Sequence, residues 1–96
     1  MMCFTIYCDP VPGKEEDVDR LLTSTIKAFW SGQSGVTGYR VHKDKLVGYP
    51  ERTIRIDVND LGALQKALDS SEWNKHRRQF IALLSRVESQ ITEQLV

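Results

Sequence analysis

Twice along this chain, a segment in which every second residue is apolar gives way to one in which apolar residues recur at every third or fourth position. The first pattern has the period of a β-strand, and the second has the period of one face of an α-helix. The alternation is cleanest over residues 53–58 and recurs over residues 3–8, so both segments are predicted to be strands. A further strand is predicted over residues 36–42, which follow a loop rich in glycine and serine.

Two helical regions are predicted between and after these strands. One helix is expected over residues 14–31, where acidic side chains occupy the first turn and are favoured there by the helix dipole. Asn59 or Asp60 should cap the second region, and Ser70 or Ser71 should cap a fresh helix after a break. The apolar stripe of that last helix continues through Trp73, His76, Phe80, Leu83 and Leu84.

The tail, residues 87–96, fits two structures. Val87, Ile91 and Leu95 recur at every fourth position, as on a helix, but alternate residues of the same stretch also fit a strand with one half-polar face. Topology favours the strand, because a fourth strand beside the first completes the split β-α-β arrangement. The predicted fold is therefore α+β and ferredoxin-like, in the order β-α-β-β-α-β, with an antiparallel sheet and the helices on one face.

The predicted strands have one apolar face and one mixed face. Helices should cover the apolar face, because a one-sided sheet needs a second layer. The apolar face comprises Phe4, Ile6, Cys8, Ile54, Ile56 and Val58. The mixed face is expected to carry Cys3, Thr5, Tyr7, Thr53, Arg55, Asp57, Tyr39 and Val41. A second copy of the chain is expected to cover the mixed face, giving a homodimer. Arg55 and Asp57 would then pair within or across the subunits, because unpaired buried charges are costly.

Size and charge limit the class of protein. The chain has 96 residues, so residues 1–96 are expected to form a single domain. Thirteen basic residues balance thirteen acidic ones, which argues against a nucleic-acid partner. The basic cluster at residues 75–78 is interpreted as a solvated helix face.

No stretch approaches the roughly 20 apolar residues that span a bilayer, so no membrane contact is expected. The start lacks the pattern of a secretion signal, so a cytoplasmic location is expected.

The residues that bind metals or cofactors do not occur in recognisable patterns. Cys3 and Cys8 would point to opposite faces of one strand, roughly 16 Å apart, and so could not form a disulfide. No spacing of cysteine and histidine indicates a metal site, and no glycine-rich phosphate loop is present. No metal and no cofactor are therefore expected.

Three stretches are more specific than the general pattern: residues 35–41, residues 52–61 and residues 67–76. With the first strand and the Pro-Gly-Lys entry to the first helix, they resemble the antibiotic-biosynthesis-monooxygenase family of dimeric α/β-barrel domains. The resemblance covers nearly the whole chain. It implies a ferredoxin-like monomer, a homodimer whose two sheets form a barrel, and a ligand cavity between sheet and helices in each subunit.

The resemblance also implies candidate chemistry. Some members of that family oxidise phenolic or quinol-type substrates with oxygen and without metal or flavin, and a subgroup binds and degrades haem. Members of the haem-degrading subgroup have an Asn on the first strand. The first strand of this chain has Thr5 and Tyr7 and no Asn.

His76 is the candidate catalytic residue, because an imidazole at neutral pH can accept a phenolic proton or ligate iron. Trp73, Trp30, Tyr39 and Phe80 are expected to contact a ligand.

The first functional hypothesis is a dimeric, monooxygenase-like protein that binds a small, flat, apolar ring compound. If it is active, the reaction is cofactor-independent oxidation with His76 as base. The alternative is a small-ligand-binding or stress-related module without catalysis. A further alternative is a haem-binding protein that uses His76.

Overall fold

The chain forms four strands and four helices in a computed structural model that describes residues 1–46 and 48–96. Their order is β1 (Met2–Pro10), α1 (Glu15–Thr23), α2 (Thr25–Ser31), β2 (Val36–Lys43), β3 (Arg52–Val58), α3 (Leu61–Asp69), α4 (Ser71–Ile81) and β4 (Leu84–Glu93). The strands form one sheet in the order β2-β3-β1-β4, and each neighbouring pair is antiparallel. This is the predicted ferredoxin-like arrangement.

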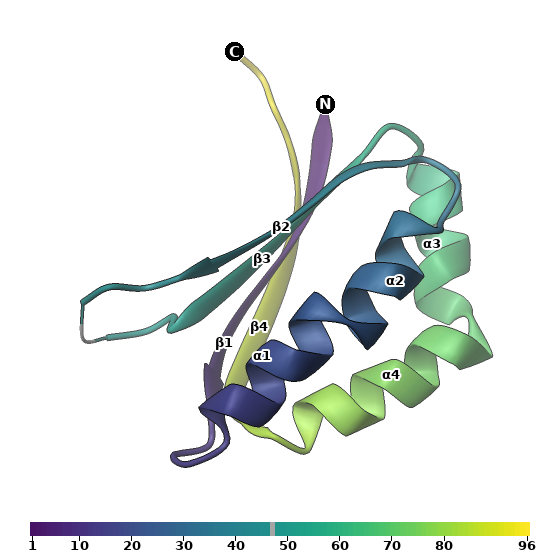
Figure 1. Ribbon diagram of the computed structural model, residues 1–96. Helices are drawn as coiled ribbons and strands as arrows, with labels where there is room; N and C mark the ends of the chain where they lie inside the picture. Colours follow the sequence, from purple (N-terminus) through teal and green to yellow (C-terminus); the bar gives the residue numbers. More distant parts are fainter. Residues whose placement is uncertain (47) are drawn as a thin grey trace.

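The helices all lie on one face of this sheet (Figure 1). The predicted apolar face packs beneath them, and its members Phe4, Ile6, Cys8, Ile54, Ile56 and Val58 are all buried. The helices complete the core with Val18, Leu22, Ile26, Phe29, Trp30, Leu64, Ala67, Trp73 and Phe80. Removal of this apolar surface from water is the main force that holds the two layers together. The prediction of a sheet covered by helices on one face is confirmed.

The first predicted helix is divided in two, so the expectation of one helix over residues 14–31 was wrong. Ser24 leaves the helical conformation, with φ −123° and ψ −89°, and separates α1 from α2. The hydroxyl of Thr23 donates to the Asp19 carbonyl at 2.8 Å, and the hydroxyl of Ser24 donates to the Arg20 carbonyl. Such side-chain bonds compete with the helical ladder, which explains the break at this pair of residues.

The helix caps and the tail follow the sequence more closely. The Asp60 side chain accepts from the Gly62 N–H at the start of α3, and the Ser70 side chain accepts from the Trp73 N–H at the start of α4. The tail is a strand, as topology favoured. α4 ends at Ile81, however, and Leu84 begins β4 rather than extending the helical stripe. Pairing with β1 draws this segment out of the helix, since Leu84 lies opposite Pro10.

Tyr39 and Val41 lie on the helix-covered face, which corrects their assignment to the mixed face. They pair with Ile56 and Ile54, two buried core residues, and cross-strand partners point to the same side of a sheet. The register of β2 shifts between Val36 and Gly38. This β-bulge inserts one extra residue, so the alternation beyond it changes face.

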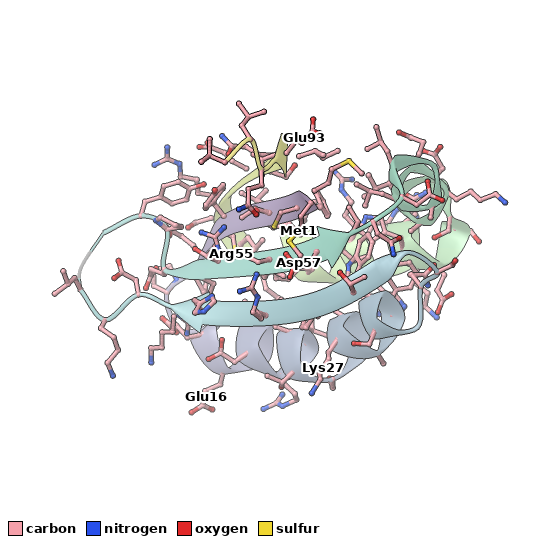
Figure 2. All side chains as sticks on the ribbon, turned by 90° about the horizontal axis from the view of Figure 1, so that it is seen from above. Met1, Glu16, Lys27, Arg55, Asp57 and Glu93 are labelled. Carbon is pink, nitrogen blue, oxygen red and sulfur yellow. The ribbon has the colours of Figure 1, made fainter. Side chains whose placement is uncertain are left out.

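The other face of the sheet, called the open face below, carries no helix. Figure 2 shows Arg55 and Asp57 on the sheet, away from α1 and α2. A guanidinium nitrogen of Arg40 donates to the two Asp57 carboxylate oxygens at 3.3 and 3.2 Å. Arg86 binds Glu88 at 3.3 and 3.1 Å. Asp57 therefore pairs with Arg40 rather than with Arg55, and Arg55 has no ion-pair partner within the described residues.

β4 is an edge strand, because β1 is its one neighbour in the sheet. Two of its apolar side chains on the helix side remain partly open to water: Val87 is 39% exposed and Ile91 is 49% exposed. The helices cover the centre of the sheet more completely than this edge. A space therefore remains beside β4.

Two expectations from the sequence, about the cysteines and about membrane-spanning segments, can be compared with the described residues. Cys8 is buried and Cys3 is partly buried, and both are free thiols. In the described part of the chain, none of the helices has both the length and the apolar character that a membrane crossing would demand.

A buried ion pair joins β3 to α1. Arg52 is 3% exposed, and its Nε donates to Oδ1 of Asp19 at 2.7 Å while its Nη2 donates to Oδ2 at 3.1 Å. Its Nη1 donates to the Glu51 carbonyl at 3.1 Å. Removal of one partner from such a pair leaves a buried charge uncompensated, which costs about 3–5 kcal/mol.

We expect Asp19→Asn to lower the free energy of unfolding by about 3 kcal/mol, because Arg52 would keep its charge without a carboxylate. The low end of the range applies since the Asp19 side chain is 45% exposed. Urea denaturation measures the change. Asp17→Asn is the matched control on the same helix: Asp17 pairs with exposed Lys14 and Arg20, so the change should stay within about 0.5 kcal/mol. Equal losses in the two variants would contradict the role of the Arg52 pair.

Candidate functional site

A cleft of about 490 Å³ opens between α4 and the edge of the sheet formed by β1 and β4. This volume lies within the roughly 300–1,000 Å³ that is typical of small-molecule sites. Phe4 and Ile6 of β1 contribute from the sheet, and Trp73 and Phe80 contribute from α4. Few of the residues that line the cleft are polar, so the cleft offers a bound molecule mainly an aromatic and aliphatic surface.

Local structure explains why α4 presents these side chains. The Ser70 cap fixes where the helix begins, and positions 73, 77, 80 and 81 then recur along one face at helical spacing. Trp73, Arg77, Phe80 and Ile81 all line the cleft. Three of these four are apolar, and the guanidinium of Arg77 is the exception.

β4 supplies the opposite wall. Three residues of β4 pair with buried residues of β1: Val87 with Cys8, Ser89 with Ile6, and Ile91 with Phe4. Because cross-strand partners point to the same side of a sheet, the side chains of Val87, Ser89 and Ile91 point toward the helices. All three line the cleft. The two residues between them, Glu88 and Gln90, belong to the alternate set of the strand and lie at its rim.

An aromatic cluster supports the cleft from behind. The Trp73 ring stacks on Phe29 at 5.5 Å between centroids and meets Trp30 edge-on at 5.0 Å. Trp30 in turn contacts Phe4 at 5.7 Å. Rings in these offset and edge-on arrangements attract one another beyond their burial alone. Trp73 is therefore held in place by α2 and the sheet as well as by its own helix.

The structure brings two of the predicted ligand-contacting residues together and separates the others. Trp73 and Phe80 line the cleft. Trp30 is fully buried behind them, and its Nε1 has no hydrogen-bond partner in the described residues. Tyr39 lies beneath α1, where its hydroxyl donates to the Leu22 carbonyl at 2.7 Å. Burial raises the pKa of the Tyr39 phenol above its ordinary value, so it stays protonated.

His76 lies outside the cleft. It lines a separate depression between α2 and α4, together with Thr25, Phe29, Gln33 and Glu72. Its Nε2 is 3.7 Å from the Glu72 carboxylate, and its ring meets Phe29 edge-on at 5.6 Å. Its buried Nδ1 has no hydrogen-bond partner among the residues described. Trp73 and His76 therefore sit on one helix but serve different surfaces.

Sequence reasoning missed Arg77, Ser89 and the exposed apolar side chains of β4. A signal for Arg77 was present: it falls four residues after Trp73 and four before Ile81, within the apolar stripe. Its place in a run of basic residues instead suggested a solvated face. Ser89 could not be assigned before the tail was known to be a strand.

Other reactive groups offer little chemistry. Burial raises the pKa of the Cys8 thiol to about 12, so at neutral pH it remains protonated and unreactive. Within residues 1–46 and 48–96, no group of three or more His, Cys, Asp or Glu side chains is placed to hold a metal ion.

No protein-family model matches the chain, and no curated protein matches it. Solved structures do resemble it closely in fold. Rv0793 from Mycobacterium tuberculosis is 19% identical, with a TM-score of 0.82 over 99% of this chain and 95% of that chain. A protein from Nitrosomonas europaea named "Putative antibiotic biosynthesis monooxygenase" is 10% identical, with a TM-score of 0.80 over the full length of both chains. A "dabb family protein with a ferredoxin-like fold" from Mesorhizobium loti is 12% identical, with a TM-score of 0.78 over 99% of this chain and 97% of that chain. The chain thus has the ferredoxin-like fold of antibiotic-biosynthesis-monooxygenase-like proteins.

Proposed function

We propose that this protein binds a small, flat, apolar ring compound in the cleft between α4 and β4, and that it does so as a homodimer. The observation that carries the proposal is the cleft itself, with Trp73 and Phe80 on one side and Val87 and Ile91 on the other. A flat ring between such walls gains both apolar burial and aromatic contact.

The aromatic cluster adds to this argument. Trp73 is fixed by Phe29 and Trp30, so a ligand does not have to order that side chain on binding. Preorganised contacts preserve affinity, because little conformational entropy is lost when the complex forms. The cleft is suited to a rigid ring compound more than to a flexible chain.

Cofactor-independent oxidation is the reaction that we propose if the cleft is catalytic. The names of structural neighbours with this fold supply the reaction class. Oxygen would convert a ring methylene to a carbonyl: one oxygen atom enters the product and the other leaves as water, with four electrons coming from the substrate. A base that deprotonates the ring compound makes electron transfer to oxygen easier.

Binding without catalysis is the second candidate, and the position of His76 favours it. In this structure His76 lies beside Glu72 in the neighbouring depression, so a ring confined to the cleft contacts Trp73 instead. For His76 to act as the base, or to ligate haem iron, the ligand would have to occupy the depression between α2 and α4.

Two copies would pair through the open face of the sheet. This face carries Tyr7 and Thr5 among several charges, of which Arg55 has no ion-pair partner in the described residues, and Thr5 is 1% exposed even in the single chain. Arg40–Asp57 and Arg86–Glu88 are already matched within one chain, so a second copy could cover them with few charges left unpaired.

The first prediction of this proposal concerns the cleft. We expect a neutral bicyclic probe, 2-naphthamide, to bind the wild-type protein, and we expect Ser89→Trp to weaken binding by at least about tenfold. The new indole would fill the space beside Ile6, because Ser89 is exposed on the wall of the cleft. Isothermal titration calorimetry measures both affinities.

Lys27→Trp is the control for that experiment, because it adds the same indole to the exposed outer surface of α2. Its affinity for 2-naphthamide should equal that of the wild type. Failure of the wild type to bind either this probe or its carboxylate counterpart, 2-naphthoate, at millimolar concentration would refute the cleft as a ring-binding site.

The second prediction concerns the dimer. Sedimentation equilibrium at micromolar concentration should give twice the 11.0 kDa of the chain. Tyr7→Arg should shift the protein to the monomer, since it puts an unmatched charge into the interface. In the monomer the open face stays in contact with water, which would solvate the new guanidinium and leave the fold intact. Lys27→Glu, on the outer side of α2, should remain dimeric; a wild-type monomer would contradict the proposal.

The third prediction separates catalysis from binding. Oxygen consumption with a panel of anthrones and quinols is expected in the wild type and should be lost in Ser89→Trp if the cleft is the reaction site. If His76 is the base, His76→Ala should lower kcat by about 100-fold or more. Unchanged oxygen consumption in His76→Ala would exclude His76 as the base, and no consumption by the wild type would leave binding without catalysis as the function.

A Soret shift on haemin titration, lost in His76→Ala, would instead support the haem alternative.

A further inference from the structure

The cleft contains one cationic side chain in an otherwise apolar helix face. Arg77 lies between Trp73 and Ile81 on the stripe of α4 that lines the cleft. An arginine that only covered apolar surface with its stem would be unremarkable at a rim. Its surroundings, however, leave the guanidinium without any partner of its own.

The carboxylates nearest in sequence or across the cleft are engaged elsewhere. Glu88 borders the cleft, but its carboxylate binds Arg86 at 3.1 Å. Its strand partner is Tyr7, a residue of the open face, so the Glu88 side chain points away from the helices. Glu72 lies 3.7 Å from His76. Arg77 makes no ion pair and no side-chain hydrogen bond within the described part of the chain.

Most other arginines of the chain are matched, which makes Arg77 stand out. Arg20, Arg40, Arg52 and Arg86 each bind a carboxylate. Arg77 alone among the chain's arginines both lacks such a partner in the described residues and borders the apolar cleft. Its guanidinium is exposed and is not held by another described side chain, so its donors are available to whatever the cleft holds.

Ser89 adds a second polar group on the opposite wall. It lies opposite Ile6 on the helix side of β4, and its hydroxyl makes no hydrogen bond to another described residue. A serine hydroxyl can donate to an anion or accept from a neutral group. The cleft therefore combines apolar walls with one cation and one hydroxyl.

Building on the proposed function, we propose that the ligand of this cleft is an aromatic carboxylate, with its ring between Trp73 and Ile91 and its carboxylate on Arg77. The planar guanidinium offers two parallel N–H donors that match the two carboxylate oxygens, which a single-point cation would not. Arg77 thus sets the preference for an acid over a neutral compound of the same shape, and the apolar walls set the preference for a ring.

A matched pair of probes tests this inference separately from the proposed function. 2-Naphthoate and 2-naphthamide have the same ring and nearly the same shape, and they differ by one negative charge. We expect the wild type to bind 2-naphthoate about tenfold more tightly, a difference of the size that one charge-assisted hydrogen-bonded contact gives. This preference should shrink as salt is added, because the exposed guanidinium is screened.

Arg77→Gln should remove the preference by weakening 2-naphthoate binding about tenfold while leaving 2-naphthamide unchanged. Arg78→Gln is the matched control: it removes the same charge from the next residue of α4, whose side chain lies on the outer surface with Lys75 and Asn74. It should keep the preference. Thermal melts of both variants should match the wild type, since both arginines are exposed.

The outcomes are distinct. Binding of neither probe would refute the proposed function itself. Equal binding of the two probes, unaffected by Arg77→Gln, would overturn the role of Arg77 and leave the ring-binding cleft intact. An equal loss of 2-naphthoate affinity in Arg78→Gln would show a general effect of helix charge and would also overturn the assignment to Arg77.

Discussion

The contact between Trp30 and Trp73 joins the two helical halves of the molecule. Their rings meet at 5.0 Å, Phe29 packs against both, and Phe4 connects them to the centre of the sheet. α2 and α4 are therefore held in one position relative to β1. That position also determines how far α4 stands from β4, and so the cleft depends on the contact of Trp73 with Trp30, which is buried behind the cleft.

The sequence predicted the elements whose pattern is local. The strand over residues 53–58 and the apolar face of the sheet follow from residue types and spacing. The caps were narrowed to Asn59 or Asp60 and to Ser70 or Ser71, and the structure has Asp60 and Ser70. The faces of β2 did not, because a single inserted residue at the bulge reverses the alternation of everything beyond it. The break at Ser24 was also missed, since it depends on hydroxyl groups that would be tolerated in many helices.

The candidate site was predicted less well, for a geometric reason. Trp73 and His76 are three residues apart, which suggests a shared face, but α4 packs against both α2 and β4 and its inner face is divided between them. Trp73 points to the cleft beside β4, while His76 points to the depression beside α2. Helical spacing shows that two residues are adjacent, but it does not show which neighbouring element each will meet. Only the position of β4, known from the structure, separates the two surfaces.

The edge position of β4 has a consequence for self-association. A ten-residue edge strand offers a row of unpaired backbone N–H and C=O groups to any passing strand, including another molecule's. Arg86 and Glu88 put charges along this strand, and such charges make uncontrolled sheet extension unfavourable. On the same strand, Val87 and Ile91 remain partly exposed to solvent and form the wall of the cleft. The wall of the cleft and the protection from fibre-like stacking are thus encoded by alternate residues of one segment.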